Sequence, residues 1–217
     1  MPHDTVPKGL LIFGFGGHAR SVADVAMAMG VSAMRFIDPA AREGERYLNH
    51  PVEADWDGQL LEGWAIFSAS GCNRQRRVHL EHARSTGWPV ATLVAPTASL
   101  GTSCHLAPGS FIGHQAHVGP QARIGLGCII NSGAIVEHES ITGDYSHVAV
   151  NATVAGRSVL GASNFIGAAA TVIDGITLAD HIQLGAGAVA VCDLAVPGLY
   201  LGIPARLHQA PKVEHNG

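Results

Sequence analysis

Residues 124–142 read IGLGCIINSGAIVEHESIT, and the pattern of this segment repeats every six residues between Val94 and Ala190. A large aliphatic residue occupies one register throughout, except at Thr142 and Ala190. The aliphatic positions are Val94, Leu100, Leu106, Ile112, Val118, Ile124, Ile130, Val136, Val148, Val154, Leu160, Ile166, Val172, Leu178 and Leu184. The residue two places before each of them is mostly small, as at Ala116, Ala122, Cys128, Ala134, Ser140 and Ser158. Self-similarity at a short fixed period predicts a stacked architecture.

A period of six fits neither an amphipathic helix nor an alternating strand over so long a stretch. It fits short strands that turn a corner every six residues, with the aliphatic and the small residue both pointing inward. Successive coils then stack about 4.8 Å apart and form continuous apolar columns. Glycine often follows the aliphatic residue, which we interpret as a need for backbone freedom at the corner. A β-sandwich with chance spacing is the alternative, and the unbroken register disfavours it.

The composition is that of a globular chain with a large core, since 47% of the 217 residues are hydrophobic and 14% are charged. A net charge of −4 gives no electrostatic basis for binding nucleic acid or an anionic membrane. Residues 1–8 lack a signal-peptide profile, and no apolar run is long enough to span a bilayer. The four cysteines form no C-x-x-C pair. We therefore predict reduced thiols, no metal site, no membrane insertion and a cytoplasmic protein.

The first forty residues follow a nucleotide-binding pattern. A buried strand is predicted over residues 9–13, a glycine-rich turn over 14–19, a helix over 21–29 and a second strand over 34–37. The second strand ends at Asp38. Strand, glycine turn, helix, strand and acid form a Rossmann-like arrangement, in which the glycines let the backbone approach a phosphate and the acid accepts a hydroxyl or N–H. A small dehydrogenase is disfavoured, because only about ninety residues precede the coil.

A third strand over residues 65–69 and a helix over 74–85 complete the N-terminal part. The helix carries four arginines, which we interpret as a solvated face, with Arg76 as the one candidate for another role. We predict a Rossmann-like nucleotide-binding domain over residues 1–92 and a coil domain with a C-terminal tail over residues 93–217.

One hexad carries a chemical signal. His138 lies between two carboxylates, Glu137 and Glu139, in the middle of the coil. Histidine is a suitable base at neutral pH, and a neighbouring carboxylate can orient its ring. If three hexads make one coil, Gly156 lies one coil along and presents a bare backbone N–H beside this base, as a donor for an oxyanion. His114 and His117 are interpreted as surface residues rather than zinc ligands.

The segments IFGFGGHAR, IVEHE, SHVAV, ATVAG and GIPAR resemble the PglD/NeuD group of hexapeptide-repeat sugar acyltransferases, over nearly the whole chain. The resemblance implies a trimeric left-handed parallel β-helix with eighteen residues per coil. It implies His138 as general base, Glu139 as its partner and the Gly156 N–H at the thioester carbonyl. The residues implied to hold the sugar nucleotide are Gly14, Gly16, Gly17, His18, Asp38, Ser70, Gly71 and Asn73. Those implied to bind acetyl-CoA are Asn131, His147, Gly156, Gly167, Ala168 and Gly185.

The sequence thus predicts acetyl transfer from acetyl-CoA to a nucleotide-linked amino sugar of the UDP-4-amino-4,6-dideoxy type, in bacterial surface glycan biosynthesis. Two rival functions stay open at this point. One is an O-acetyltransferase acting on a sugar or sialic acid hydroxyl, and the other is a non-catalytic nucleotide-binding scaffold.

Overall fold

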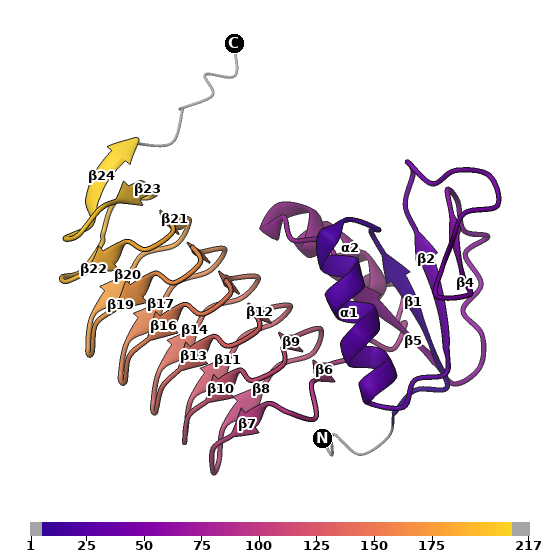
Figure 1. Ribbon diagram of the computed structural model, residues 1–217, viewed down its shortest axis with the longest axis horizontal. Helices are drawn as coiled ribbons and strands as arrows, with labels where there is room; N and C mark the ends of the chain where they lie inside the picture. Colours follow the sequence, from indigo (N-terminus) through magenta and orange to yellow (C-terminus); the bar gives the residue numbers. More distant parts are fainter. Residues whose placement is uncertain (1–5, 210–217) are drawn as a thin grey trace.

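The computed structural model describes residues 6–209 and consists of an N-terminal α/β unit packed beside a three-sided coil (Figure 1). The N-terminal unit contains β1 (Gly9–Phe13), α1 (Gly17–Ala28), β2 (Ala33–Ile37), β3 (Arg46–Tyr47), β4 (His50–Glu53), β5 (Trp64–Ser68) and α2 (Asn73–Ser85). Its sheet has the order β3-β4-β2-β1-β5, with only β3 antiparallel to its neighbour. None of the helices described is long and apolar enough to cross a membrane.

Two local features of this unit differ from the sequence prediction. Helix α1 begins at Gly17, four residues before the predicted start, with Gly16 as its N-cap. The glycine-rich turn and the first turn of the helix are therefore one element. The hairpin of β3 and β4 was not predicted, because its strands are too short for an alternating pattern to stand out.

The coil is a left-handed parallel β-helix, as predicted. Its strands are β6 (Leu93–Val94), β7 (Ser99–Leu100), β8 (His105–Leu106), β9 (Phe111–Ile112), β10 (His117–Val118), β11 (Arg123–Ile124), β12 (Ile129–Ile130), β13 (Ile135–Val136), β14 (Ile141–Thr142), β15 (His147–Val148), β16 (Thr153–Val154), β17 (Val159–Leu160), β18 (Phe165–Ile166), β19 (Thr171–Val172), β20 (Thr177–Leu178), β21 (Ile182–Leu184) and β22 (Val189–Ala190). Every third strand pairs, so Val118, Val136, Val154 and Val172 form one ladder with a spacing of 18 residues. After the coil, β23 (Gly198–Leu201) and β24 (Arg206–Gln209) extend one of the three sheets.

The inward positions match the predicted hexad rule. From Ile112 to Leu184 every aliphatic of the register is at most 1% exposed, and so are the small residues from Ser110 to Ala170. Leu100 is 42% exposed because it belongs to the first coil, which has no preceding coil to cover it.

The reason proposed for the corner glycines is wrong. Gly119, Gly143 and Gly167 do not have a positive φ. Instead, a Cβ on Gly119 would lie 2.5 Å from the backbone nitrogen of His138, in the next coil, and one on Gly167 would lie 2.6 Å from that of Ala186. These positions need glycine because successive coils approach too closely for a side chain. The left-handed conformation falls two residues later in the turn, on residues such as Glu139 and Arg157.

The coil has three edges, which we name by their neighbours. The α2 edge consists of residues 125–128, 143–146 and 161–164. The α1 edge consists of residues 113–116, 131–134, 149–152 and 167–170. The free edge consists of residues 119–122, 137–140, 155–158 and 173–176. The face between the α1 and α2 edges carries β6, β9, β12, β15 and β18, and we name it the docked face. The free edge is the edge opposite the docked face.

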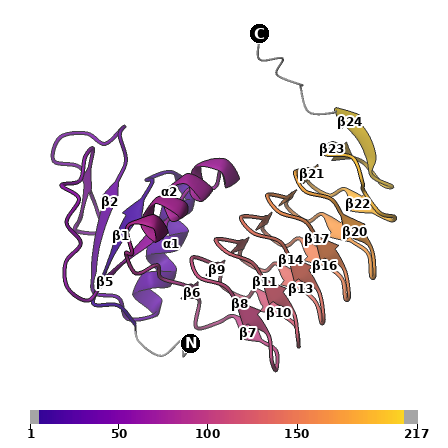
Figure 2. The same ribbon diagram turned by 180° about the vertical axis from the view of Figure 1, so that it is seen from behind.

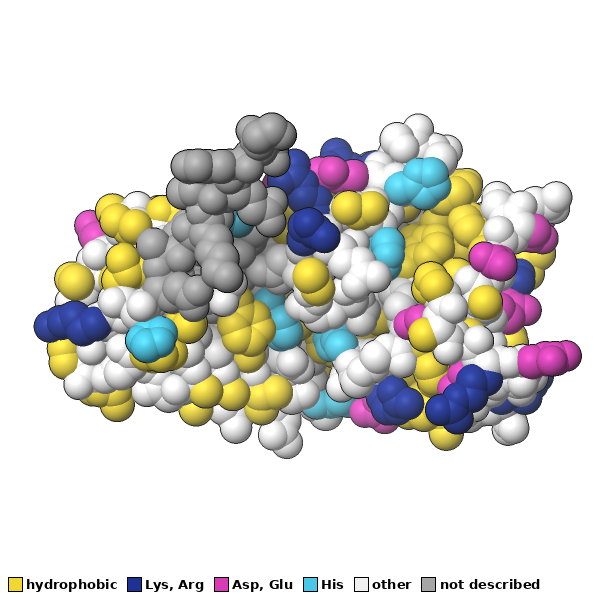
Figure 3. Space-filling model, turned by 90° about the horizontal axis from the view of Figure 1, so that it is seen from above, with side chains coloured by type: hydrophobic (Ala, Val, Ile, Leu, Met, Phe, Trp, Pro, Cys, Tyr) yellow, Lys and Arg dark blue, Asp and Glu magenta, His cyan; other side chains and the backbone are white. Residues whose placement is uncertain are grey.

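The N-terminal unit packs on the docked face, where its apolar core includes the outward side chains of Phe111 and Ile129, each 1% exposed. Figures 1 and 2 show the unit beside the first coils from both sides. Seen from above, histidine side chains gather around the boundary between the two parts (Figure 3). On the α1 edge, His114 lies 3.2 Å from the carboxylate of Asp24 in α1.

Arg76 in α2 joins the two parts and is completely buried. Its guanidinium donates to the carbonyl oxygens of Gly127 at 2.6 Å and Tyr145 at 2.7 Å, both on the α2 edge, and to that of Ser70 at 2.9 Å. This arginine therefore belongs neither to a solvated face nor to a phosphate site. The division of the chain between residues 92 and 93 stays a prediction.

Candidate active site

His138 lies on the free edge of the coil, in the turn that follows β13. Its Nδ1 is 3.1 Å from Oε2 of Glu139, and both side chains are about half exposed. Glu139 has the left-handed backbone conformation, with φ of 59°. Because the turn is sharp, adjacent side chains of this pair can meet. The carboxylate bound at Nδ1 leaves Nε2 as the nitrogen that can take a proton from a substrate.

Gly156 lies directly against this ring, one coil along the free edge. A Cβ on Gly156 would lie 2.6 Å from both Cε1 and Nε2 of His138, so a side chain at this position would displace the imidazole. The 18-residue spacing thus brings together the two residues that the sequence analysis paired. Within residues 6–209, the Gly156 N–H donates to no acceptor. A base and an unused backbone donor side by side can serve proton removal and oxyanion stabilisation.

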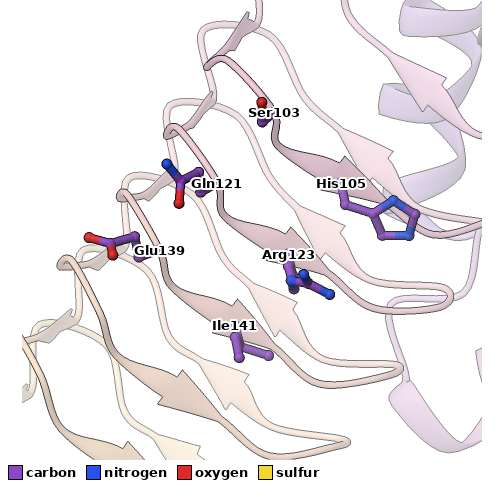
Figure 4. Close-up of a pocket in the computed structure, with 6 residues that line it drawn as sticks. All are labelled: Ser103, His105, Gln121, Arg123, Glu139 and Ile141. Carbon is purple, nitrogen blue, oxygen red and sulfur yellow. The ribbon is translucent and has the colours of Figure 1, made fainter.

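A pocket of about 590 Å³ is bounded by Glu139, the partner of His138, and extends toward the first turns of the β-helix. Its lining side chains form two columns, with Ser103, Gln121 and Glu139 in the turns and His105, Arg123 and Ile141 on the strands (Figure 4). The pocket brings Arg123 and His105 to the side of Glu139 that faces the N-terminal end of the coil. An anionic group could therefore be held near the candidate base.

The glycine-rich turn lies at the N-terminus of α1 and is open. A Cβ on Gly16, Gly17 or Gly71 would meet nothing within 4 Å, which leaves space for a ligand against the backbone. Gly14 has φ of 93°, which only glycine adopts readily. Asp38 uses its carboxylate internally, accepting from the N–H of Phe15 at 2.7 Å and of Ala40 at 2.9 Å.

Ser70 and Asn73 also make internal contacts. The Ser70 hydroxyl lies 3.1 Å from Oε1 of Gln75. The Asn73 amide donates to the carbonyls of Ser163 and Asn164 at 3.0 Å each and accepts from Arg76. The structure thus uses Asp38, Ser70 and Asn73 to shape the turn and dock the domain. Their predicted contacts with a sugar nucleotide stay predictions.

His18 and His147 meet at the boundary between the two parts, with ring centroids 6.3 Å apart. His18 also packs edge-on against Phe111, and the amide nitrogen of Asn131 lies 3.4 Å from Nε2 of His147. Within residues 6–209, Nε2 of His18 and Nδ1 of His147 are buried without a hydrogen-bond partner. Two neutral imidazoles and an amide therefore face one another where the glycine-rich turn meets the docked face.

Burial lowers the pKa of His18 to about 3, with smaller effects of His147 and Arg76. Burial likewise lowers the pKa of His147 to about 4, assisted by the charge of Arg76. Both rings are thus neutral in the folded protein at pH 7, and the unfolded chain binds protons at these positions from about pH 6.5 downward.

Stability should therefore fall as the pH drops below about 6.5. Between pH 6.5 and 5.5 the two histidines together should cost about 2 kcal/mol of unfolding free energy, since each pKa shift disfavours the protonated folded state. Urea denaturation at pH 7.5, 6.5 and 5.5 measures this loss. The double variant His18→Asn, His147→Asn should lose less stability over the same range. Equal pH dependence in the two proteins would contradict the assignment.

The residues predicted for acetyl-CoA lie in two different places around the β-helix. Asn131, Gly167, Ala168 and Gly185 are on the α1 edge, and His147 is in β15, on the docked face beside that edge. Gly156 is on the free edge, across a whole face of the prism. One chain therefore does not bring this predicted set together.

The sequence analysis missed Arg157 and Asp174. Asp174 is one coil beyond Gly156, and its Oδ2 lies 3.1 Å from the position of a Cβ on Gly156. Arg157 follows Gly156 and donates from Nη2 to Oδ1 of Asp174 at 2.5 Å. The 18-residue spacing that led from His138 to Gly156 leads equally to Asp174, so the signal was present.

Comparisons with known proteins identify the family of the chain. Residues 9–83 match the family model of the PglD N-terminal domain. The acetyltransferase domain of PglB from Neisseria gonorrhoeae is 28% identical, with a TM-score of 0.88 over 92% of this chain and 99% of that chain. A histidine-to-alanine mutant of GDP-perosamine N-acetyltransferase from Caulobacter crescentus, in complex with CoA and GDP-perosamine, is 31% identical, with a TM-score of 0.85 over 93% and 97% of the two chains.

The Neisseria domain is also known in complex with acetyl coenzyme A, at 28% identity and a TM-score of 0.88 over 93% of this chain and 99% of that chain. A search of curated proteins finds no match. The matches to these relatives cover both the N-terminal unit and the coil, and nearly the whole length of each relative. The chain therefore belongs to the PglD/NeuD-like family of hexapeptide-repeat sugar acyltransferases.

Proposed function

We propose that this protein transfers the acetyl group of acetyl-CoA to the amino group of a nucleotide-linked amino sugar, in the assembly of a bacterial surface glycan. The observation that carries the proposal is the contact of the His138 ring with Gly156, beside an unused backbone N–H. Relatives solved with acetyl-CoA and with CoA plus GDP-perosamine support both substrate classes. We also propose a cytoplasmic location and no resident metal.

In this mechanism the sugar amine attacks the thioester carbonyl directly. Nε2 of His138 removes the proton that the amine loses, while Glu139 holds the ring through Nδ1 and stabilises the imidazolium. The Gly156 N–H donates to the carbonyl oxygen as negative charge develops on it. The tetrahedral intermediate then collapses, the C–S bond breaks, and CoA leaves as its thiol with the proton that Nε2 of His138 had taken, which returns the imidazole to its neutral form.

A covalent acyl-enzyme is not needed in this scheme. Ser140 is the hydroxyl nearest in sequence to the base, but it is fully buried and donates to the carbonyl of Ala155 at 2.9 Å. Cys128 is also buried, and burial raises the pKa of its thiol to about 12. Neither group can present a nucleophile at the free edge.

A homotrimer would complete the site. The glycine-rich turn, His18 and His147 lie on the docked face, whereas His138 and Gly156 lie on the opposite free edge. If the free edge of one chain lies beside the α1 edge of the next, the base faces the nucleotide-binding turn of its neighbour. Acetyl-CoA would then lie between the prisms, against Gly156 of one chain and Gly167, Ala168 and Gly185 of the other.

The function is tested by incubating the protein with radiolabelled acetyl-CoA and a panel of acceptors. We expect label on UDP- or GDP-linked 4-amino-4,6-dideoxy sugars and none on free sialic acid. Transfer to a hydroxyl of sialic acid would instead establish the O-acetyltransferase. No binding of acetyl-CoA in calorimetry would contradict the proposed function and favour the non-catalytic scaffold.

A further inference from the structure

The α2 edge shows one way in which this coil satisfies the free N–H at a corner. The N–H of Leu126 donates to Oδ1 of Asp144 at 2.8 Å, and the N–H of Ala162 donates to Oδ1 of Asp180 at 2.7 Å. In both cases the aspartate is 18 residues further on, at the same corner of the next coil. At these two corners, an aspartate therefore accepts a hydrogen bond from the backbone N–H at the same corner of the preceding turn.

Asp174 has this same relation to Gly156 on the free edge, but it does not cap it. The Asp174 carboxylate accepts from Arg157 instead, and the Gly156 N–H donates to none of residues 6–209. Oδ2 of Asp174 nevertheless lies beside Gly156, 3.1 Å from where its Cβ would be. A rotation that brought this carboxylate to the amide would reproduce the capping seen on the α2 edge, and the ion pair with Arg157 opposes that rotation.

A capped Gly156 would be unable to stabilise the reaction. The N–H would already be donating to a carboxylate, and an uncompensated negative charge would lie next to the oxygen on which negative charge develops. Both effects raise the energy of the transition state. The contacts that acetyl-CoA and the sugar nucleotide make elsewhere, away from the thioester oxygen, are unaffected.

We propose that Arg157 is a positioning residue for acetyl transfer: by pairing with Asp174 it keeps the Gly156 N–H uncapped and available to the thioester oxygen. This inference rests on the proposed function. Arg157 and Asp174 are both about half exposed, so the pair can form and break without disturbing the core of the coil.

The test is a double-mutant cycle on kcat at saturating acetyl-CoA and sugar nucleotide. Arg157→Ala should lower kcat by about 10- to 100-fold, up to the loss caused by removing one oxyanion donor, with little change in KM. Arg157→Lys should retain most of the rate, since lysine can hold the carboxylate. Asp174→Ala should not slow the enzyme, because it removes the competing acceptor. The double variant Arg157→Ala, Asp174→Ala should recover the rate lost in Arg157→Ala.

Rescue by the second substitution separates positioning from a merely structural role, because damage to the fold would not be repaired by a further truncation. Arg77→Ala, which breaks an exposed ion pair with Glu81 in α2, serves as the matched control and should leave kcat unchanged. A normal rate for Arg157→Ala, an equal loss for Asp174→Ala, or no recovery in the double variant would each overturn the inference. His138→Ala is measured alongside, since full activity of that variant would overturn the proposed function itself.

Discussion

Replacing His138 with alanine should lower kcat by about 10²–10⁴-fold, the usual contribution of a positioned general base. The amine must lose a proton as it attacks, and Nε2 of His138 is one of the two atoms nearest to the position of a Cβ on Gly156, at 2.6 Å. The substitution removes no buried group, because the His138 side chain is 42% exposed. Steady-state kinetics with both substrates saturating measure the effect, and the unfolding midpoint of the variant should be close to that of the native chain.

His117→Ala is the matched control for this prediction. His117 is a partly exposed histidine of the same coil, in β10, and its strand partner in the next turn is Ile135 rather than a glycine. We expect its rate to stay within about twofold of the native rate, since it lies outside the proposed site. A near-normal rate for His138→Ala, or an equal loss for His117→Ala, would rule out His138 as the base.

Replacing Arg76 with alanine should lower the free energy of unfolding by about 3–5 kcal/mol, because several buried carbonyl oxygens lose their donor at once. Arg76 is fully buried, and its guanidinium connects Ser70 of the N-terminal unit with Gly127 and Tyr145 of the coil. Burial lowers its pKa to about 10, so it keeps its charge at pH 7. Urea denaturation followed by circular dichroism measures the loss.

The neighbouring Arg77 supplies the control for this prediction. Arg77 pairs with Glu81 on the exposed side of the same helix, 2.7 Å apart, and a surface pair of this kind contributes less than about 1 kcal/mol. Arg77→Ala should therefore leave the stability almost unchanged. A loss below about 1 kcal/mol for Arg76→Ala would show that water replaces the guanidinium, and that the two parts are held together by apolar contact.

The coil could be predicted in detail because its contacts repeat at fixed intervals. The burial of Val136 and Ser140 follows from the six-residue period. The meeting of His138 with Gly156 follows once the family resemblance supplies eighteen residues per turn, because each residue then meets the one 18 positions later. Counting a further 18 residues from Gly156 leads to Asp174. This residue was overlooked only because the counting stopped at Gly156. The role of the corner glycines was misjudged, because the spacing between coils is a property of packed backbones rather than of local conformation.

The N-terminal unit was predicted less completely. Its strands and helices follow from apolar runs and glycine turns, but the side chains that close the site do not. The sequence pattern assigns Asp38 and Asn73 to a ligand. In the structure, the Asp38 carboxylate accepts a hydrogen bond from the N–H of Phe15, and the Asn73 amide donates one to the carbonyl of Ser163 in the coil. A polar residue at the end of a strand or the start of a helix is compatible with either use, and only the distance to its neighbours distinguishes them.

By itself, then, the sequence determined the coil, its six-residue register and the glycine-rich turn, because each of these depends on contacts at a short or constant separation along the chain. With the eighteen residues per turn that the family resemblance implies, it also predicted the adjacency of the candidate base and donor. Only the tertiary structure decided that α2 docks through a buried arginine, that His18 meets His147, and that the candidate base lies on the edge opposite the glycine-rich turn. These facts depend on how two rigid bodies orient against each other. That orientation is set by packing between residues far apart in the chain, such as Ile129 against the core of the N-terminal unit. It cannot be predicted from a sequence period or a motif.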